Sequence, residues 1–194
     1  MDRAAAVPDP VTPAPVDRGD DRQALAAQVA ASLRDIPDFP EPGVLFKDFT
    51  PLLLDVPLRA RVVADVCGRH AGVDLVVGIE ARGFVLGAMV ADQLGAGFVP
   101  VRKAGKLPSQ VHRVDYELEY GSATLEVHTD AIAPGQRVLV VDDVLATGGT
   151  AAAACELVER CGGEVVAIEV VLELGFLGGR DRLPGHTLNA LITS

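Results

Sequence analysis

Short apolar segments alternate with helix-like segments over most of the chain, and this alternation constrains the fold more than any other feature. Strands that are apolar throughout are buried on both faces, which is typical of a parallel sheet covered by helices. We therefore predict an α/β fold with such a sheet. The expected strands lie at residues 75–78, 98–101, 137–141 and 164–172. The expected helices lie at residues 58–70, 83–94 and 151–161, after an earlier helix that carries the apolar stripe Leu25, Val29 and Leu33 and stops before Pro37. In the helix at 83–94, the expected apolar face comprises Val85, Ala88 and Met89.

The N-terminal part of the chain differs in composition from the rest. Residues 1–20 are rich in Ala, Pro and Asp, which predicts a disordered tail before one folded domain at residues 21–194. Four prolines and a glycine at residues 36–51 predict an ordered but irregular loop. Leu45 and Phe46 lie in this loop, either closing the edge of the core or facing a ligand.

The net charge of −10 argues against a nucleic-acid or membrane-surface partner, since both need basic patches. Three cysteines without paired spacing form neither a disulfide framework nor a zinc pattern. No apolar run is long enough to span a bilayer, and the N-terminus lacks the hydrophobic region of a signal peptide. These observations favour a cytoplasmic protein.

The most informative segment is VLVVDDVLATGGT at residues 138–150, where an expected buried strand is followed by a turn and a helix. Glycines in the turn let the backbone approach a phosphate, and N–H groups there lie at the positive end of the helix dipole. Neither a Walker A loop nor a Rossmann fingerprint is present. The predicted phosphate-binding residues are Ala146, Thr147, Gly148, Gly149 and Thr150.

Asp142 and Asp143 precede this turn, where a pentose would lie if its phosphate occupied the turn. Carboxylates can accept hydrogen bonds from vicinal hydroxyls or hold a metal ion through water. Either aspartate alone would more simply be a solvated acid at the end of a strand. The complete string, with two acids before a small-residue turn, favours the binding role.

A second cluster of polar residues follows two other expected strands. Arg82, between a strand and a helix, suits either a diphosphate or an ordinary surface position, and its surroundings in sequence favour the surface. Arg102, Lys103 and Lys106 begin a polar segment at residues 102–123, whose length is typical of a lid. The alternation that follows at Thr124–His128 predicts an exposed strand that pairs with part of this segment.

Several of these motifs resemble one family. The string at 138–150 is similar to the motif that binds phosphoribosyl pyrophosphate (PRPP) in type I phosphoribosyltransferases, and GIEARGF at 78–84 is similar to their pyrophosphate loop, which implies a cis peptide at Glu80–Ala81. Four further stretches resemble the adenine-specific members of this family: IPDFPEPGVLFKD, VRKAGKLP, YELEYG and VLELGFLGGRDRL. The resemblance runs from about residue 22 to about residue 183, and the segment between Pro108 and Asp115 departs from it.

The resemblance implies a role for each matched position, beginning with the 5-phosphate turn and the ribose acids above. For pyrophosphate, it implies Glu80, Ala81, Arg82, Arg102, Lys103 and Lys106. For adenine, it implies a small N-terminal hood with Val44, Leu45, Phe46 and Lys47, together with Leu174. For catalysis, it implies Glu119 and Tyr120 on a mobile lid loop.

The implied reaction transfers the 5-phosphoribosyl group of PRPP to N9 of adenine and yields AMP and pyrophosphate. Mg²⁺ is expected to enter on PRPP, without a direct protein ligand, and the enzyme is expected to be a homodimer in which Arg102 reaches pyrophosphate in its own or the partner subunit. Transfer to a 6-oxopurine, a non-catalytic PRPP-sensing regulator and a purely structural protein on the same fold are the alternatives. The hood, the YELEYG loop and the intact phosphate turn argue against them.

Overall fold

The computed structural model describes residues 18–39, 41–117 and 122–194. Seven strands form its central sheet: β3 (Leu75–Ile79), β4 (Gly97–Lys103), β5 (Val111–Glu117), β6 (Ser122–His128), β7 (Arg137–Leu145), β8 (Glu164–Glu173) and β9 (Leu188–Thr193). Their spatial order is β5-β6-β4-β3-β7-β8-β9. Five neighbouring strands, in the spatial order β4-β3-β7-β8-β9, are parallel, whereas β6 is antiparallel to both β4 and β5. The sheet is therefore mixed, with its antiparallel part at one edge.

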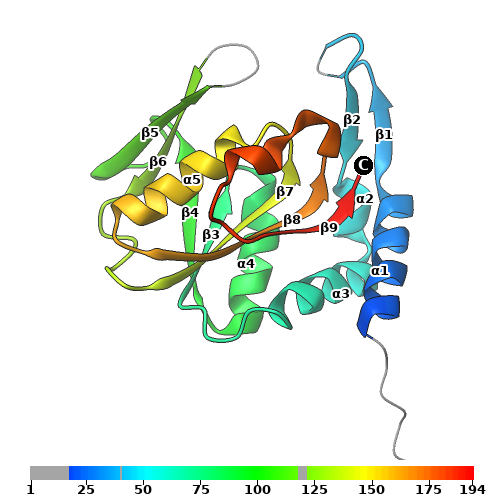
Figure 1. Cartoon of the computed structure of the whole chain (residues 1–194), viewed down its shortest axis with the longest axis horizontal. Coiled ribbons are helices and arrows are strands. Elements are labelled where there is room, and N and C mark those ends of the chain that lie inside the picture. The colour runs from blue at the N-terminus through cyan, green and yellow to red at the C-terminus, as the bar shows by residue number, and fades with distance from the viewer. Residues whose placement is uncertain (1–17, 40, 118–121) are drawn as a thin grey trace, which may run out of the picture.

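Helices and a second, two-stranded sheet complete the fold. The remaining elements are α1 (Arg18–Ser32), β1 (Arg34–Pro37), β2 (Leu45–Asp48), α2 (Thr50–Leu54), α3 (Val56–Cys67), α4 (Arg82–Leu94), α5 (Gly149–Arg160), η1 (Gly175–Leu177) and η2 (Gly179–Arg182). The β1–β2 hairpin and the β5–β6 arm extend beyond the same end of the central sheet (Figure 1). None of the helices in the described part of the chain has both the length and the apolar character required to cross a bilayer.

Apolar side chains cover both faces of the sheet, as the continuous apolar strands predict. Val77, Val140 and Ile168 pack toward α5 on one face. Val76 and Leu139 pack on the other face, together with apolar side chains of α1, α3 and α4. Adjacent residues of one strand thus enter different cores, which removes the hydrophobic alternation seen in strands with one solvated face.

Helix α4 packs through a different face from the predicted one. Val85 is 45% exposed and Ala88 is also exposed, whereas Leu86 and Val90 are buried. Gly87 explains this difference, because a Cβ atom there would lie 3.3 Å from Cα of Gly78 on β3. A face that includes glycines allows the helix backbone to approach the strand closely but carries little hydrophobic signal.

Two further expectations about elements were wrong. The proline-rich segment at 36–51 is not merely irregular, since Arg34 to Pro37 pair with Leu45 to Asp48 in the β1–β2 hairpin. Strand β6 is not an exposed strand, because Leu125, Glu126 and Val127 are all buried. Strand β9 had no counterpart among the predicted elements. Helix α1 begins at Arg18, within the segment expected to be a tail, and the rest of that segment lies outside the described residues.

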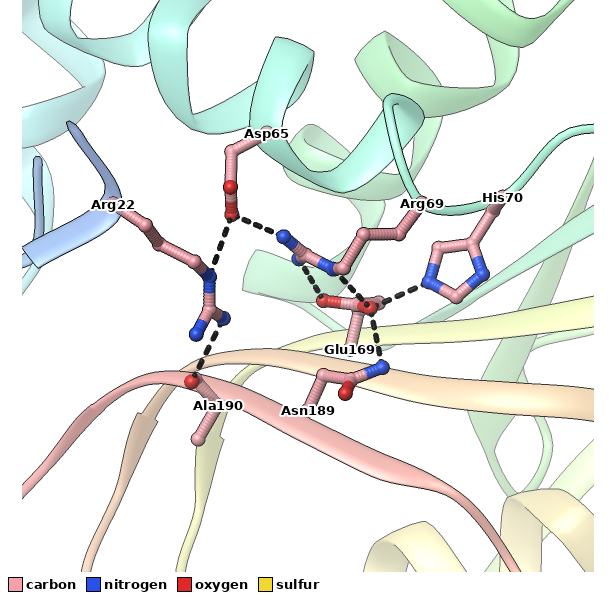
Figure 2. Close-up of polar contacts among 7 residues, drawn as sticks. All are labelled: Arg22, Asp65, Arg69, His70, Glu169, Asn189 and Ala190. Atoms are coloured by element: carbon pink, nitrogen blue, oxygen red, sulfur yellow. Dashed lines mark hydrogen bonds and ion pairs between the residues drawn. The ribbon is translucent and has the colours of Figure 1, made fainter. Parts of the chain in front are cut away.

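A polar network centred on a buried glutamate links the first and last elements of the described chain (Figure 2). At its centre, the carboxylate of Glu169 on β8 accepts hydrogen bonds from Arg69 (Nη2, 2.8 Å) and Asn189 (Nδ2, 2.8 Å), and lies 2.5 Å from Nε2 of His70. Arg69 also donates to Asp65 (2.6 Å) on α3. The network is outside the pocket described below, and it ties α3 and the adjoining turn to β8 and β9.

The N-terminal helix enters the same network through Arg22. Its Nη2 atom donates to the backbone oxygen of Ala190 on β9 at 3.0 Å, and its Nε atom lies 3.4 Å from Oδ2 of Asp65. The first described helix and the last strand are thereby fastened to each other (Figure 2).

Candidate functional site

A pocket lies where the carboxyl ends of β3, β4 and β7 meet. In open α/β sheets, this edge is where ligands bind. Its walls come from these strand ends, from the start of α4 and from the β5–β6 arm. The lining residues are Glu80, Ala81, Arg82, Lys103, Tyr116, Ala123, Leu125, Asp142, Asp143, Val144, Ala146 and Thr150. Residues predicted from three separate sequence motifs therefore share one pocket.

The predicted phosphate turn opens helix α5. Gly148 has a left-handed backbone (φ 82°), and its C=O accepts a hydrogen bond from N–H of Ala152 at 2.9 Å. A smaller hollow beside the main pocket is lined by Ala146, Thr147, Gly148 and Thr150, together with Asp142. The N–H groups of the first turn of a helix lack intrahelical partners and lie at its positive end. This hollow therefore has the form of an anion site.

The two aspartates lie on β7 itself, because the strand continues to Leu145 instead of ending at Val141. Asp143 is almost fully buried, and its carboxylate accepts a hydrogen bond from Nε of Arg82. The carboxylate of Asp142 accepts a hydrogen bond from its neighbour's backbone N–H at 2.9 Å. Burial raises the pKa of Asp142 well above the usual range of a carboxyl, and the nearby charge of Asp143 raises it further.

Arg82 connects this pair of acids to the N-terminal hairpin. Its guanidinium carbon lies 5.0 Å from the ring centroid of Phe46 on β2 and 5.9 Å from that of Phe49. The same guanidinium group donates to Asp143. Because its side chain is still 43% exposed, Arg82 can also reach a ligand in the pocket.

A cluster of opposite charges forms around Glu80, the first residue of the predicted cis peptide. The Glu80–Ala81 bond is cis in the structure. The carboxylate of Glu80 contacts Nζ of Lys106, accepts from backbone N–H of Lys103 at 3.1 Å and lies 3.4 Å from Nε of Arg102. Burial opposes its ionisation, but the hydrogen bonds from these three residues outweigh burial and lower the pKa of Glu80.

The hood hairpin presents its predicted residues in different directions. Leu45 is 54% exposed, so it does not close the edge of the core. Phe46 is half-buried and stacks edge-on against Phe39 with 5.1 Å between centroids. Nζ of Lys47 lies 2.5 Å from the carboxylate of Asp35 on the paired strand. Only Phe46 of these three is shown in contact with a pocket residue, Arg82.

The remaining predicted residues are Leu174, assigned to the base, and the catalytic pair Glu119 and Tyr120. Leu174 follows β8, is half-buried, and donates from its N–H to C=O of Leu145 at 2.9 Å. Glu119 and Tyr120 lie outside the described residues. Tyr116 lines the pocket but was not assigned a role, although it begins the YELEYG motif. Alternate residues of a strand point to the same face, so Ala123 shares a face with Leu125. Tyr116 pairs with Ala123 and therefore lies on that face too, and this alternation would have identified it.

Comparisons with known proteins agree with this geometry. Residues 54–182 match the family model described as "Phosphoribosyl transferase domain". An adenine phosphoribosyltransferase of Salinispora arenicola is 58% identical over 179 residues, which cover 91% of this chain and 95% of that protein.

Solved structures are similar over nearly the same length. The crystal structure of adenine phosphoribosyltransferase from Thermoanaerobacter pseudethanolicus has a TM-score of 0.84 and 46% identity, and covers 87% of this chain and 99% of that one. The Saccharomyces cerevisiae enzyme, complexed with an imino-altritol bisphosphate and adenine, has a TM-score of 0.81 and 40% identity, and covers 87% and 98%.

Proposed function

Because this chain belongs to the adenine phosphoribosyltransferase family, we propose that the pocket at the carboxyl ends of β3, β4 and β7 binds PRPP and adenine side by side. The enzyme transfers the 5-phosphoribosyl group of PRPP to N9 of adenine and releases AMP and pyrophosphate. One observation carries the assignment of residues: the turn at the start of α5, the two acids of β7 and the cations near Glu80 converge on one pocket.

The turn at Ala146–Thr150 is proposed to bind the 5-phosphate. Backbone N–H groups at the start of α5 would donate to the phosphate oxygens, and the hydroxyls of Thr147 and Thr150 would add two donors. Asp142 and Asp143 would then face the ribose hydroxyls. Arg82 already shields the charge of Asp143, which is what allows two adjacent carboxylates to remain in a largely buried position.

The cationic wall is proposed to bind pyrophosphate through Arg82, Arg102, Lys103 and Lys106, with the backbone at Ala81. The side chain of Glu80 cannot have this role, because a carboxylate repels an anion. Its contacts support another function, which is to hold Arg102 and Lys106 together beside the pocket. Pyrophosphate would compete with the Glu80 side chain for these cations, so Glu80 can contribute to anion binding only through its backbone.

The hood is proposed to read adenine through backbone groups and not through side chains. The N–H and C=O groups of Val44 are engaged within the hairpin turn, with Glu41 and Phe39 respectively, so we assign the base edge to the stretch Leu45–Lys47. A C=O facing N6 and an N–H facing N1 would accept adenine and oppose a 6-oxopurine. Phe46 and Leu174 would lie against the ring.

The chemistry asks little of the protein beyond alignment, neutralisation and exclusion of water. Glycosyl transfer of this kind passes through an oxocarbenium-like transition state, so the enzyme has to align N9 with C1 of the ribose. Glu119 and Tyr120 are proposed to act from the loop that joins β5 and β6. Water must be excluded because PRPP would otherwise hydrolyse.

Mg²⁺ is proposed to enter with PRPP. Carboxylate oxygens of Asp142 and Asp143 lie at the pocket and suit a hydrated Mg²⁺ ion, which prefers one or two carboxylates plus substrate phosphates. Among the described residues, no group of three or more His, Cys, Asp or Glu side chains could form a metal site by itself. When bound, the ion would neutralise charge on the departing diphosphate.

The location and assembly of the enzyme are proposals of the same kind. Cys67, Cys155 and Cys161 are all free thiols, which supports a reducing cytoplasm. A homodimer is proposed from the family resemblance, and sedimentation of the purified chain tests it. We also propose that residues 21–194 act as one phosphoribosyltransferase domain.

An assay of AMP formation from labelled adenine and PRPP tests the function, with hypoxanthine and guanine as competitors. Each buried group that faces a like partner costs about 1–3 kcal/mol, so a 6-oxopurine should be used about a hundredfold less well than adenine. Comparable use of hypoxanthine would refute the proposed role of the hood. No product from any of the three bases would refute the proposed reaction.

A further inference from the structure

The backbone of Gly179 lies directly against the phosphate turn. A Cβ atom on Gly179 would overlap the backbone oxygen of Ala146 and would come within 2.9 Å of the backbone nitrogen of Gly148. Conversely, a Cβ atom on Gly148 would overlap the backbone oxygen of Gly179. The two segments are far apart in sequence, and neither leaves room for a side chain between them.

An ion pair holds Gly179 in this place. The guanidinium group of Arg180 donates to both carboxylate oxygens of Glu173, from Nε at 3.0 Å and from Nη2 at 2.6 Å. Its Nη1 atom also donates to the backbone oxygen of Leu188 at 3.0 Å. Glu173 is buried at the end of β8, so the pair joins the η1–η2 segment to two strands of the sheet.

The same segment begins at the proposed base-binding side. Leu174 follows Glu173, and its N–H donates to the backbone of Leu145, which directly precedes the phosphate turn. The segment therefore meets this region at two points. Leu174 contacts Leu145 just before the turn, and Gly179 lies against Ala146 and Gly148 within it.

We infer that Glu173, Gly179 and Arg180 are positioning residues that set the shape of the phosphate turn. This inference rests on the proposed function, since it takes the turn at Ala146–Thr150 as the 5-phosphate site. The N–H groups that bind a phosphate must point at one place, and a turn that contains two adjacent glycines has little stiffness of its own. Contact with the backbone of Gly179, fixed by the bidentate Arg180–Glu173 pair, supplies that stiffness.

Gly179→Ala tests the contact with the smallest change. The φ angle of Gly179 is not in the left-handed region, so alanine is compatible with its backbone. The added methyl group would push Ala146 and Gly148 away and misalign the N–H groups. Gly175→Ala is the matched control, because it lies in the same segment and its methyl group would meet only Cγ2 of Thr193 (3.2 Å) and the oxygen of Ser194 (3.5 Å).

Calorimetry should compare ribose 5-phosphate with inorganic pyrophosphate as ligands of the full chain. In Gly179→Ala, the affinity for ribose 5-phosphate should fall by about tenfold or more, since small displacements of binding groups have effects of this size. The affinity for pyrophosphate should stay near that of the unmodified protein, as should both affinities in Gly175→Ala. Equal ribose 5-phosphate affinity in Gly179→Ala and the unmodified protein would overturn the inference, as would an equal loss for both ligands.

A second pair of variants tests the ion pair. Arg180→Met leaves the buried Glu173 without its partner, so it should lower the melting temperature and also weaken ribose 5-phosphate binding, while leaving pyrophosphate binding unchanged. Arg180→Lys should recover part of the loss, because a lysine keeps the charge without the bidentate geometry. If Arg180→Met lowered only the melting temperature, the pair would be structural and the inference would fail.

These measurements separate the inference from the proposed function. If the unmodified protein did not bind ribose 5-phosphate, the assignment of the 5-phosphate to the turn would fail. If it bound that ligand and the Gly179 and Arg180 variants bound it equally well, the assignment would stand and only the support would be refuted.

Discussion

Two clusters of charged side chains in this molecule each centre on a glutamate with an arginine beside it, but their surroundings differ. In the Glu169 network, the central carboxylate is 3% exposed and is surrounded by Arg69, His70 and Asn189 (Figure 2). In the pocket, the carboxylate of Glu80 is 10% exposed, but Lys106, which contacts it, is 45% exposed. The Glu169 network is the more enclosed of the two, since the side chains of Arg69 and His70 are 27% and 10% exposed.

The difference indicates what each cluster does. A carboxylate that is removed from water, such as that of Glu169, must stay paired, because a lone buried charge is very costly. A cation that remains exposed, such as Lys106, can exchange its carboxylate partner for an anion from solution. The Glu169 network thus stabilises the arrangement of α1, α3, β8 and β9, whereas the pocket cluster is suited to exchange Glu80 and Asp143 for a phosphate-bearing ligand.

Removing the centre of the Glu169 network should have the largest effect. Glu169→Ala should lower the free energy of unfolding by about 3–5 kcal/mol, because three side chains lose the buried carboxylate that they share, and only Arg69 keeps a second carboxylate partner, Asp65. Urea denaturation measures this change. Glu156→Ala is the control, since Glu156 and Arg160 form an exposed pair on one helix and its loss should cost only about 0–1 kcal/mol. Equal losses in both variants would contradict the distinction between the clusters.

Asp142→Asn should have the opposite balance, with binding lost and stability gained. Hydrogen bonds to charged groups contribute about 1.5–3 kcal/mol, so PRPP affinity should fall by about tenfold to a hundredfold in calorimetry. Because burial and then Asp143 raise the pKa of Asp142 in the folded state, the unmodified protein loses stability as pH rises from the usual carboxyl pKa of 3.8 through the raised value.

The asparagine variant lacks this loss. Its melting temperature should exceed that of the unmodified protein at neutral pH, and the difference should shrink as pH falls below 3.8. A variant that is less stable than the unmodified protein at pH 7 would show that Asp142 is stabilised in the fold and not strained by its surroundings.

Lys106→Ala should sharpen the comparison with a smaller effect. Its exposed side chain contributes little to folding, so the free energy of unfolding should change by about 0.5 kcal/mol or less. Pyrophosphate affinity should fall by about fivefold to tenfold, since one charge-assisted contact is lost. Ribose 5-phosphate affinity should not change. A loss for both ligands would mean that Lys106 acts on the pocket as a whole.

Lys47→Ala should have the smallest effect. The Lys47–Asp35 pair joins two strands of the hood at the surface, and such pairs contribute about 0–1 kcal/mol. Because the proposed base reading uses backbone groups, the preference for adenine over hypoxanthine should be unchanged in a competition assay. A changed preference would move base selection to the lysine side chain.

The β1–β2 hairpin and strand β9 show why some elements could not be predicted from sequence. Strands β1 and β2 are four residues each, β1 ends in a proline, and the segment around them is rich in proline, so their local signal is that of a loop. Strand β9 reads LNALIT without a clear period, and it becomes a strand because Ile168, Val170 and Leu172 of β8 pair with it. Strand pairing is a long-range interaction, and short windows of sequence do not contain it.

The pocket shows the same division at the level of single residues. Motifs at residues 78–84, 101–108 and 138–150 predicted that an acid pair, a set of cations and a phosphate turn would meet at one edge of the sheet. They did not predict that Glu80 would bind the cations, that Arg82 would lie between Asp143 and Phe46, or that Gly179 would lie beneath the turn. Each of these contacts joins residues from different motifs.

The sequence by itself determined the succession of central strands and helices along the chain, the glycine-containing turn before α5 and the family to which the chain belongs. Local chemistry suffices for these features, because continuous apolar runs specify buried strands and a small-residue turn specifies close backbone approach. Tertiary structure alone decided the mixed sheet, the network around Glu169 and the partners of each charge in the pocket. A charged side chain can pair with any opposite charge that folding brings near it, and only the packed arrangement of the strands and helices selects which one.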